Sequence, residues 1–425
     1  MRLRILTHYY PPEVGAPQVR LAALAHGLAQ AGAEVTVHTG FPHYPDGEIK
    51  PPYRNRPLRI EQTDGVRVLR SWVYAAPNRG FARRLANHAS LATAALAAAA
   101  AGGPADVLLV ETPPLLLAGA AIAYARAKRA RLVLNVADLW PDSAVEMGTL
   151  NSPRAIGAAR RLERGAYRSA AAIACPTEGI FSTLEARPES AGKAALMRPA
   201  VDLSRFDPIA ADFDPAIGGS KSAAANGLRA TDGESPMRVL YAGTVGLAHG
   251  LDTLLDAAEE LERDAESPDR WPRPHLAVTI AGDGADAPAL RTRLAARGPA
   301  GVRMLGAVAA ECIPSLYAES DVAVVMLRDL PIFEGALPTK LLEAMAAGRP
   351  VILAARGEAA RLVEKERCGV VVPPEDPRAL AEALTALAAD PSRRAALGAA
   401  GRRAAERDFG REAWLCRWHA LLASA

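Results

Sequence analysis

A small-residue turn that runs directly into an amphipathic helix is the stretch of this sequence with the clearest chemical meaning. Residues 334–352 read EGALPTKLLEAMAAGRPVI, and the helix expected over 338–347 places Lys340 and Glu343 on one face because they are three residues apart. Backbone N–H groups at the start of a helix favour phosphate, and a lysine beside them adds positive charge. A carboxylate about one turn later can accept both hydroxyl groups of a ribose. The stretch therefore predicts a nucleotide-diphosphate site; the alternative is a capped helix with a solvated Lys–Glu pair.

Two further glycine turns follow expected strands in the same half of the chain, in YAGTVGLAHG (241–250) and IAGDGAD (280–286). Bare backbone at such turns can approach a phosphate closely, although any one of them could be an ordinary turn. The spacing matches neither a dinucleotide-binding G-x-G-x-x-G motif nor a Walker A loop, so we expect neither of those sites. The small residues of the three turns are Gly243, Gly246, Gly250, Gly282, Gly284, Gly335 and Ala336.

Strands and helices alternate on both sides of an irregular segment, and this alternation predicts the fold class. Short apolar strands separated by longer helical patterns are typical of α/β domains with a parallel sheet covered on both faces. We expect two doubly wound domains, over 1–206 and 237–408, joined by a Gly/Ser/Ala-rich linker with a flexible insert over 207–236. Ligands of such folds lie at the carboxyl ends of the strands, here in a central cleft between the domains.

The charge of the chain is unevenly distributed. Residues 1–200 carry 24 Lys and Arg against 15 Asp and Glu, and residues 201–425 carry 26 against 32. A basic first half suggests an anionic partner, such as a membrane surface or a phosphorylated acceptor. Aromatic residues make up only 5% of the chain and do not alternate with basic ones, so we do not expect nucleic-acid binding.

Cysteine usage and the apolar segments give expectations about location. The four cysteines lie far apart without metal-ligand spacing, which favours reduced thiols in a cytosolic protein and no metal site. The first residues form a strand pattern rather than a signal peptide. The apolar stretches 91–103 and 113–125 are shorter than the roughly 20 residues that a spanning helix needs, so both are expected to be buried helices.

Several motifs, in order along nearly the whole chain, resemble the retaining GT-B glycosyltransferases of family 4. They match best the WbuB/WcaI-like subgroup, which builds O-antigen and colanic-acid repeat units. The motifs are YYPPEVGAPQVRLAALAHGLAQAGAEVTVHTGFPHYPDG (9–47), DLWPDSAVEMG (138–148), YAGTVGLAHGLDTLLDAA (241–258), AGDG (281–284) and PTKLLEAMAAGRPVI (338–352). The resemblance implies that a hexose or amino-hexose is transferred from a nucleotide diphosphate, usually UDP. It also implies retention of anomeric configuration without a metal cofactor, and a final helix, 409–425, that crosses back to the first domain.

The resemblance also suggests roles for residues of the second domain. Glu343 resembles the ribose-binding second glutamate of the family's paired-glutamate motif. Glu334 lies nine residues earlier, where the family spacing is eight, and is the expected catalytic or donor-sugar residue. Thr244 and His249 stand in the loop where many relatives carry Arg or Lys, so Lys340 is expected to neutralise the diphosphate leaving group.

In the first domain, the resemblance implies that two loops contribute site residues. EVGAP (13–17) falls where relatives have a glycine-rich loop facing the donor sugar, with Gly15 and Ala16 as the small residues. Asp138 ends the strand in NVADLWP, and we expect it to contact donor or acceptor hydroxyls as a catalytic-site residue rather than only cap a helix. His43 could reach the cleft on the acceptor side, but we expect an ordinary surface-loop histidine.

Arg79, Arg83 and Arg84 precede an apolar helix and could form a basic lip for a polyprenyl-diphosphate-linked acceptor, or simply a solvated helix face. A lip of this kind would favour a peripheral position on the cytoplasmic face of the plasma membrane, at about 1 kcal/mol per cation. Two other functions remain open. One is a soluble transferase acting on a small acceptor, such as an inositol phosphate or a natural-product aglycone, and the other is a non-catalytic nucleotide-sugar-binding protein. An epimerase of the same fold is a weaker alternative.

Overall fold

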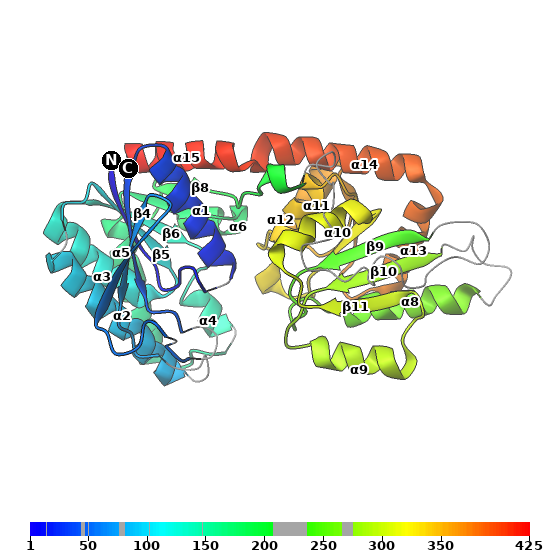
Figure 1. Cartoon of the computed structure of the whole chain (residues 1–425), viewed down its shortest axis with the longest axis horizontal. Coiled ribbons are helices and arrows are strands. Elements are labelled where there is room, and N and C mark those ends of the chain that lie inside the picture. Colours follow the sequence, from blue (N-terminus) through cyan, green and yellow to red (C-terminus); the bar gives the residue numbers. More distant parts are fainter. Residues whose placement is uncertain are drawn as a thin grey trace. The chain divides into compact units, whose positions relative to one another are not determined.

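The computed structural model describes residues 1–13, 15–43, 47–49, 51–75, 81–101, 103–146, 148–206, 236–265 and 275–425. They form two compact units (Figure 1): unit 1 comprises Met1–Pro199 with Glu412–Ala425, and unit 2 comprises Ala200–Arg411. All of the expected linker 207–236 except its last residue lies outside the described residues. The division at residue 200 precedes the expected boundary at 206, because Val201 and Phe206 are buried in the core of unit 2.

Unit 1 contains an eight-stranded sheet in the order β3-β4-β2-β1-β5-β6-β7-β8. All neighbouring strands are parallel except β3, which runs antiparallel to β4 at one edge. The strands are β1 (Arg2–Leu6), β2 (Glu34–Gly40), β3 (Leu58–Thr63), β4 (Val66–Ser71), β5 (Val107–Thr112), β6 (Arg131–Val136), β7 (Ala172–Cys175) and β8 (Ala194–Leu196). The helices are α1 (Ala16–Gln30), α2 (Phe81–Ala101), α3 (Leu115–Lys128), α4 (Asp142–Glu146), α5 (Pro153–Ser169), α6 (Glu178–Glu185) and α15 (Arg411–Ser424).

The core of unit 1 follows from its apolar strands. β5 is buried along its whole length and pairs with β1 in register, Leu3 with Val107. Strands buried on both faces need helices on both sides, which explains their continuous apolar sequences. The expected buried helix 113–125 is confirmed in α3, since most of its apolar side chains are buried. The described helices include none whose length and apolar character would let it cross a bilayer.

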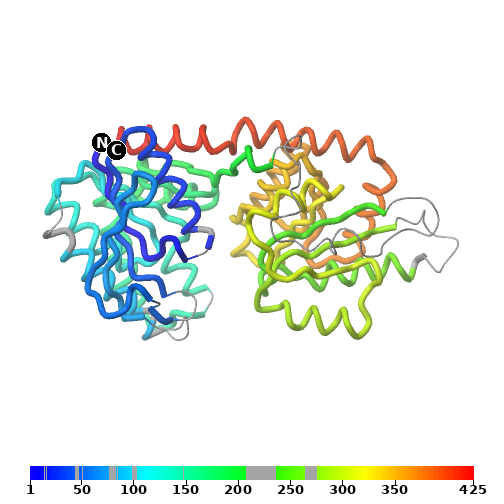
Figure 2. The backbone as a smooth tube through the Cα atoms, viewed as in Figure 1, coloured from blue at the N-terminus to red at the C-terminus, as the bar shows by residue number. Residues whose placement is uncertain are grey.

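The last helix, α15, belongs to unit 1 rather than to the unit that precedes it in the chain. Trp414, Trp418 and Leu422 are buried on it, and Arg131 donates from Nη1 to the carbonyl of Ala423 at 3.0 Å. A Cβ at Gly27 of α1 would overlap the side chain of Leu415, so this glycine permits close packing of the two helices. In the tube view, the N-terminal and C-terminal ends of the chain lie together in unit 1 (Figure 2).

Unit 2 contains six parallel strands in the order β11-β10-β9-β12-β13-β14. The strands are β9 (Met237–Ala242), β10 (Leu276–Ala281), β11 (Val302–Gly306), β12 (Val322–Met326), β13 (Val351–Ala354) and β14 (Gly369–Val372). The helices are α8 (Asp252–Ala265), α9 (Ala287–Arg297), α10 (Ile313–Glu319), α11 (Thr339–Ala346), α12 (Gly357–Glu366), α13 (Pro377–Ala389) and α14 (Pro391–Ala404). Short helical turns are η1 (Leu203–Phe206), η2 (Ala310–Cys312), η3 (Pro331–Phe333) and η4 (Ala405–Phe409).

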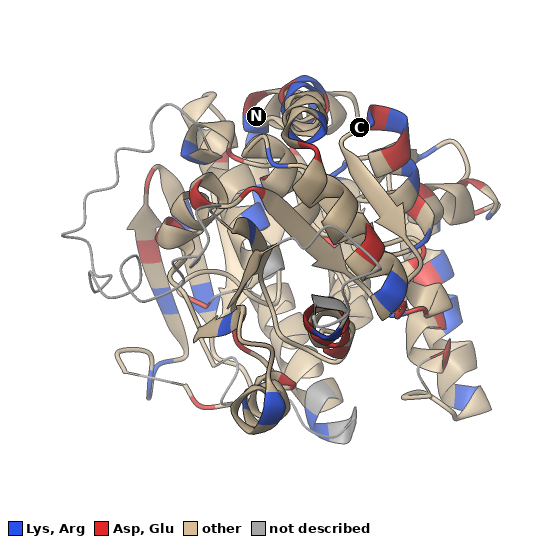
Figure 3. Ribbon diagram, turned by 90° about the vertical axis from the view of Figure 1, so that its right-hand side faces the viewer, with Lys and Arg blue, Asp and Glu red and all other residues tan. Residues whose placement is uncertain are grey.

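Two hydrophobic clusters cover the two faces of this sheet. One joins strand residues to α10, α11 and α12, and the other joins them to α8, α9 and α13. Acidic and basic residues both occur along the helices of this unit (Figure 3), and Arg293 of α9 pairs with Asp256 and Glu259 of α8. The predicted pair of doubly wound α/β sheets is confirmed.

Candidate functional site

The glycine turns after β9 and β10 pack backbone against backbone. Gly243, Gly282 and Gly284 have φ values of 140°, 152° and 159°, a region that side-chain-bearing residues rarely adopt. A Cβ at Gly282 would overlap the carbonyl of Gly243, and one at Gly284 would overlap the carbonyl of Val245. These glycines therefore join the ends of two neighbouring strands, a role that the sequence analysis did not foresee.

The N–H groups of these three glycines already have partners. Gly243 donates to the carbonyl of Ala281 at 2.8 Å, Gly282 to that of Gly306 at 2.8 Å, and Gly284 to Oδ1 of Asp283 at 2.9 Å. Within the described residues, the N–H groups of Thr244 and Gly246 donate to no protein atom. The loop after β9 thus has backbone donors available to a ligand, those of Thr244 and Gly246 among them.

Lys340 lies beside this loop and is buried. Its side chain reaches from the start of α11 to β9, where Nζ donates to Oη of Tyr241 at 2.6 Å, and a Cβ at Gly243 would be 3.2 Å from Nζ. No carboxylate of the described residues lies within 4.0 Å of Nζ. Burial lowers the pKa of Lys340 to about 7, against the opposing attraction of Glu343. The site therefore contains a buried amine that lacks an anionic partner.

Glu343 follows one turn later on α11 and is half-buried. Burial raises its pKa, while Arg205 and Lys340 act to lower it. Tyr317 of α10 donates its hydroxyl to the carbonyl of Lys340 at 3.1 Å, which ties α11 to α10. The alternative of a solvated Lys–Glu pair is wrong for Lys340, because its side chain is only 8% exposed.

His249 is half-buried at the end of the same loop. Its Nδ1 has no hydrogen-bond partner, and its ring centroid is 6.2 Å from that of Tyr241. Burial, and then the charge of Lys340, lower the pKa of His249 to about 4. The imidazole is therefore neutral at pH 7 and supplies no positive charge to the site. Thr244 offers its unpaired N–H at the same loop.

Glu334, Gly335 and Ala336 form the turn after η3. The carbonyl of Glu334 accepts from the N–H of Glu358 at 2.7 Å, and the N–H of Ala336 donates to the carbonyl of Phe333 at 3.0 Å. The N–H of Gly335 donates to no atom of the described residues. Glu334 is an exposed residue. Gly357 has a φ of 75° and no side chain, so α12 can begin directly against the backbone of Glu334.

The candidates in unit 1 lie at the carboxyl edge of its sheet. Gly15 immediately precedes α1 and has extended backbone, and Ala16 is the first residue of that helix. Asp138 follows β6, and its Oδ2 accepts from Oγ of Ser143 in α4 at 2.7 Å. This bond orients the carboxylate and also supports the start of α4.

His43 is buried, so its interpretation as a surface-loop histidine is wrong. Its backbone N–H donates to Oε1 of Glu13 at 2.8 Å, Nδ1 lies 2.8 Å from the carbonyl of Phe41, and Nε2 lies 3.0 Å from Nδ2 of Asn87. Both ring nitrogens therefore have partners within the protein. His8 packs against this ring at 5.7 Å between centroids, and no local motif in the sequence marks it as a site residue.

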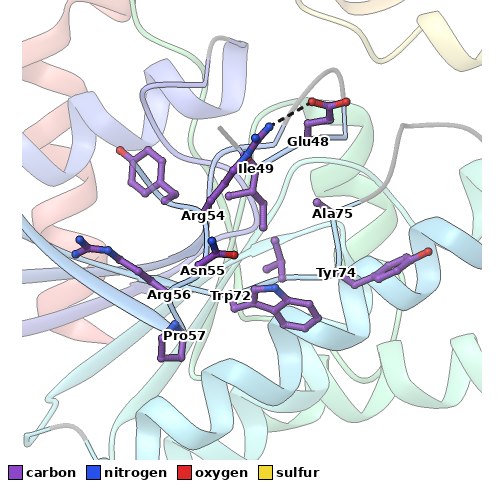
Figure 4. A pocket seen from close by; sticks show the side chains of 11 residues that line it. Glu48, Ile49, Arg54, Asn55, Arg56, Pro57, Trp72, Tyr74 and Ala75 are labelled. Atoms are coloured by element: carbon purple, nitrogen blue, oxygen red, sulfur yellow. Dashed lines mark hydrogen bonds and ion pairs between the residues drawn. The ribbon is translucent and has the colours of Figure 1, made fainter. Parts of the chain in front are cut away.

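The basic residues expected before the apolar helix are only partly described. Arg79 lies outside the described residues, Arg83 is exposed on α2, and Arg84 is placed only as part of that helix. The structure instead shows a hollow of about 860 Å³ in unit 1 (Figure 4), which the sequence analysis missed. It is lined by residues of the 48–57 segment and by Trp72 and Tyr74, which are 51% and 42% exposed.

Two family models match the chain and together cover most of it. Residues 15–200 match "Glycosyl transferase 4-like domain", and residues 236–390 match "Glycosyl transferases group 1". Alpha-D-kanosaminyltransferase of Streptomyces kanamyceticus is 31% identical over 56% of each chain. D-inositol 3-phosphate glycosyltransferase of Xylanimonas cellulosilytica is 33% identical over 50% of this chain and 46% of its own. The chain thus spans about half the length of these curated relatives.

A third relative matches over greater length at lower identity. The putative colanic acid biosynthesis glycosyl transferase WcaI of Escherichia coli K12 is 23% identical over 89% of this chain and 90% of its own. Among solved structures, sucrose-phosphate synthase from Thermosynechococcus elongatus is similar with a TM-score of 0.70 at 20% identity, both chains being covered in full. Anabaena HepE in complex with UDP-glucose has a TM-score of 0.66 at 18% identity, over 99% of this chain and 100% of its own. These two likenesses show the fold.

Proposed function

Because the chain belongs to the family 4 (group 1) glycosyltransferases and has their GT-B fold, we propose that it transfers a glycosyl residue from a nucleotide-diphosphate sugar to an acceptor. The observation that carries this proposal is the buried Lys340, which lies beside the loop after β9 without a carboxylate partner. Burying a cation without an anionic partner costs free energy, and a bound diphosphate would supply the negative charge that offsets this cost.

The proposed roles follow from these contacts. Lys340 neutralises the diphosphate as it leaves, and the N–H groups of Thr244, Gly246 and Gly335 donate to its oxygens. Glu343, one turn after Lys340, accepts the ribose hydroxyls. Donors that are already in place stabilise the charge of the leaving group without reorganisation, which is the main way such a site can accelerate transfer.

For the remaining assigned residues we propose contacts with the sugars. Glu334 presents an exposed carboxylate at the turn before α11, suited to donor-sugar hydroxyls or to the reaction centre. Asp138, held by Ser143, is proposed to contact donor or acceptor hydroxyls, and Gly15 and Ala16 to lie near the donor sugar. We propose UDP as the nucleotide, supported by the UDP-glucose bound in HepE, and a hexose or N-acetylamino-hexose as the transferred group.

We propose a lipid-linked saccharide as the acceptor, in the assembly of a surface polysaccharide by a cytoplasmic, peripheral membrane enzyme. The match to WcaI, named for colanic acid biosynthesis, supports a role in polysaccharide assembly, and the hollow with exposed Trp72 and Tyr74 supports an apolar acceptor. A small soluble acceptor is the second candidate, favoured by the relatives named for inositol phosphate and kanosamine.

Isothermal calorimetry tests the donor site. UDP, GDP, dTDP and ADP are titrated into the wild type and into Lys340→Ala and Glu343→Ala, with and without EDTA. Lys365→Ala, a change at an exposed lysine of α12, is the matched control. We expect UDP to bind selectively, with affinity lowered in both site variants and unchanged in the control. Equal affinity in all four proteins would contradict the assignment.

Turnover separates transfer from simple binding. Slow release of UDP from a UDP-hexose in the absence of acceptor, lost in Lys340→Ala, is expected of a transferase. A protein that binds UDP-hexose and releases none over many hours would instead be a non-catalytic nucleotide-sugar-binding protein.

A further inference from the structure

Tyr241 is fully buried near the end of β9, and its hydroxyl lies between two parts of the site. The hydroxyl donates to the carbonyl of Thr244 at 2.6 Å. A phenolic oxygen has one proton to donate, so the bond to Lys340 Nζ, also 2.6 Å long, is one that the hydroxyl accepts. The Tyr241 hydroxyl therefore links the Lys340 amine to the carbonyl of Thr244. Thr244 is also the residue whose own N–H has no partner among the described residues.

The ring of Tyr241 adds a second constraint. Nζ of Lys340 lies 4.2 Å from the ring centroid, within the range of a cation–π contact. Gly243 leaves room for the lysine chain, because a Cβ there would be 3.1 Å from Cε. A lysine has four rotatable bonds and loses considerable conformational entropy when it is held in one place. In this structure that entropy is already lost before any ligand arrives.

We propose that Tyr241 is a positioning residue that holds the Lys340 amine against the Thr244–Gly246 loop, so that amine and loop meet the diphosphate as one preformed unit. This inference rests on the proposed function, because it takes Lys340 as the group that meets the diphosphate. It goes further by naming a residue that touches no substrate. Pre-organisation of this kind increases affinity by removing an ordering cost at binding.

The charged and titratable groups around Lys340 define how the arrangement responds to pH. They are Glu343 on α11, His249 after β9, Tyr317 on α10 and Tyr241 itself, with Arg205 of η1 acting on Glu343. Replacing Tyr241 by Phe keeps the ring but removes the hydroxyl that accepts from Nζ. The amine then remains buried without its hydrogen-bond acceptor, so its pKa falls and the diphosphate meets a neutral amine over a wider pH range.

The experiment compares Tyr241→Phe with Tyr317→Phe, a matched control because Tyr317 bonds the backbone carbonyl of the same lysine. UDP affinity is measured by calorimetry from pH 5.5 to 9. We expect Tyr241→Phe to weaken UDP binding roughly tenfold at pH 7 and to move the loss of binding to lower pH. Tyr317→Phe should stay within about twofold of the wild type, with an unchanged profile. In a Lys340→Ala background, Tyr241→Phe should cause no further loss.

A second readout is independent of nucleotide binding. The Cε resonance of Lys340, assigned by comparison with Lys340→Ala, reports its titration by NMR in the unliganded protein. We expect its midpoint to be lower in Tyr241→Phe than in the wild type. An unchanged midpoint, or an equal loss of UDP affinity with and without Lys340, overturns the role of Tyr241. A wild type that binds no nucleotide, but in which Tyr241→Phe shifts the midpoint, overturns the proposed function alone.

Discussion

A lysine buried without a carboxylate destabilises the protein that contains it, so Lys340 connects the chemistry of the site to the stability of unit 2. Its side chain is only 8% exposed, and its hydrogen bond goes to a neutral hydroxyl rather than to an anion. Retaining such a group is reasonable only if a ligand uses its charge. The sequence predicted Lys340 and Glu343 as site residues from their spacing, but it could not show that the lysine is buried, because Tyr241 lies 99 residues earlier in the chain.

Lys340→Met should stabilise the protein at pH 6 by about 1–4 kcal/mol and weaken UDP binding, because it replaces a buried charge by an apolar chain of similar length. The pKa of Lys340 is about 7 in the folded protein and 10.5 ordinarily. Below pH 7 both folded and unfolded states carry the proton, and the full cost of burial is present. Between pH 7 and 10 the folded state has lost it, so wild-type stability rises with pH relative to the variant. Urea unfolding at pH 6 and 9 measures this; a constant difference would contradict it.

At the scale of elements, the glycine turns of unit 2 pack two neighbouring strands together, and their binding of a ligand is a proposal. Gly282 and Gly284 bring the end of β10 against the backbone after β9. The loop after β9 is consequently held against the end of β10, and its N–H groups at Thr244 and Gly246 have no partner among the described residues. The sequence identified these glycines as phosphate-binding turns because glycine permits both roles, and spacing alone does not separate them.

Gly282→Ala should therefore destabilise unit 2 by roughly 3 kcal/mol or more, because the new Cβ overlaps the carbonyl of Gly243 at a φ of 152°. Gly157→Ala is the control, since a Cβ there meets nothing within 4 Å on α5. In a helix interior that change should stabilise by about 0.5–1 kcal/mol. Urea unfolding of both variants checks the contrast, and equal effects would refute the packing role.

The hollow of unit 1 gives a prediction for the acceptor side. Trp72→Ala should lower transfer to a polyprenyl-diphosphate-linked saccharide and flotation with vesicles containing 30% phosphatidylglycerol, while UDP affinity stays unchanged. Exposed aromatic side chains at a hollow are suited to apolar ligand or membrane surfaces. Leu305→Ala, a change at an exposed apolar residue of unit 2, is the control. Absence of any flotation in low salt would favour a small soluble acceptor.

At the scale of the whole molecule, the division into compact units does not follow the order of the elements in the chain. α15 follows unit 2 in the chain but buries Trp414 and Trp418 within unit 1. Each unit has its own hydrophobic core, so we expect them to respond separately to ligand and to mutation.

Calorimetry should accordingly resolve two effects. Trp418→Ala should lower the stability of unit 1 by about 3–5 kcal/mol through loss of a buried aromatic side chain. UDP at about 100 times its Kd should raise the free energy of unfolding of unit 2 by about 2.7 kcal/mol. The transition temperature of unit 2 should rise accordingly, and that of unit 1 should stay unchanged. If UDP moved the unit 1 transition alone, the nucleotide site would have to be reassigned.

The sequence by itself determined the two doubly wound sheets, the family resemblance and the turn-plus-helix that contains Lys340 and Glu343. These features depend on local periodicity and on glycine or lysine at particular positions. Both can be recognised in the sequence without knowing which segments pack together. The antiparallel edge strand β3 was missed, because its alternation of partly exposed residues is weak. Only the tertiary structure decided that His43 is buried, that the N–H groups of three site glycines are engaged, and that Tyr241 accepts from Lys340. Each of these depends on which strands become neighbours, and residues far apart in the chain meet only when the sheet is assembled.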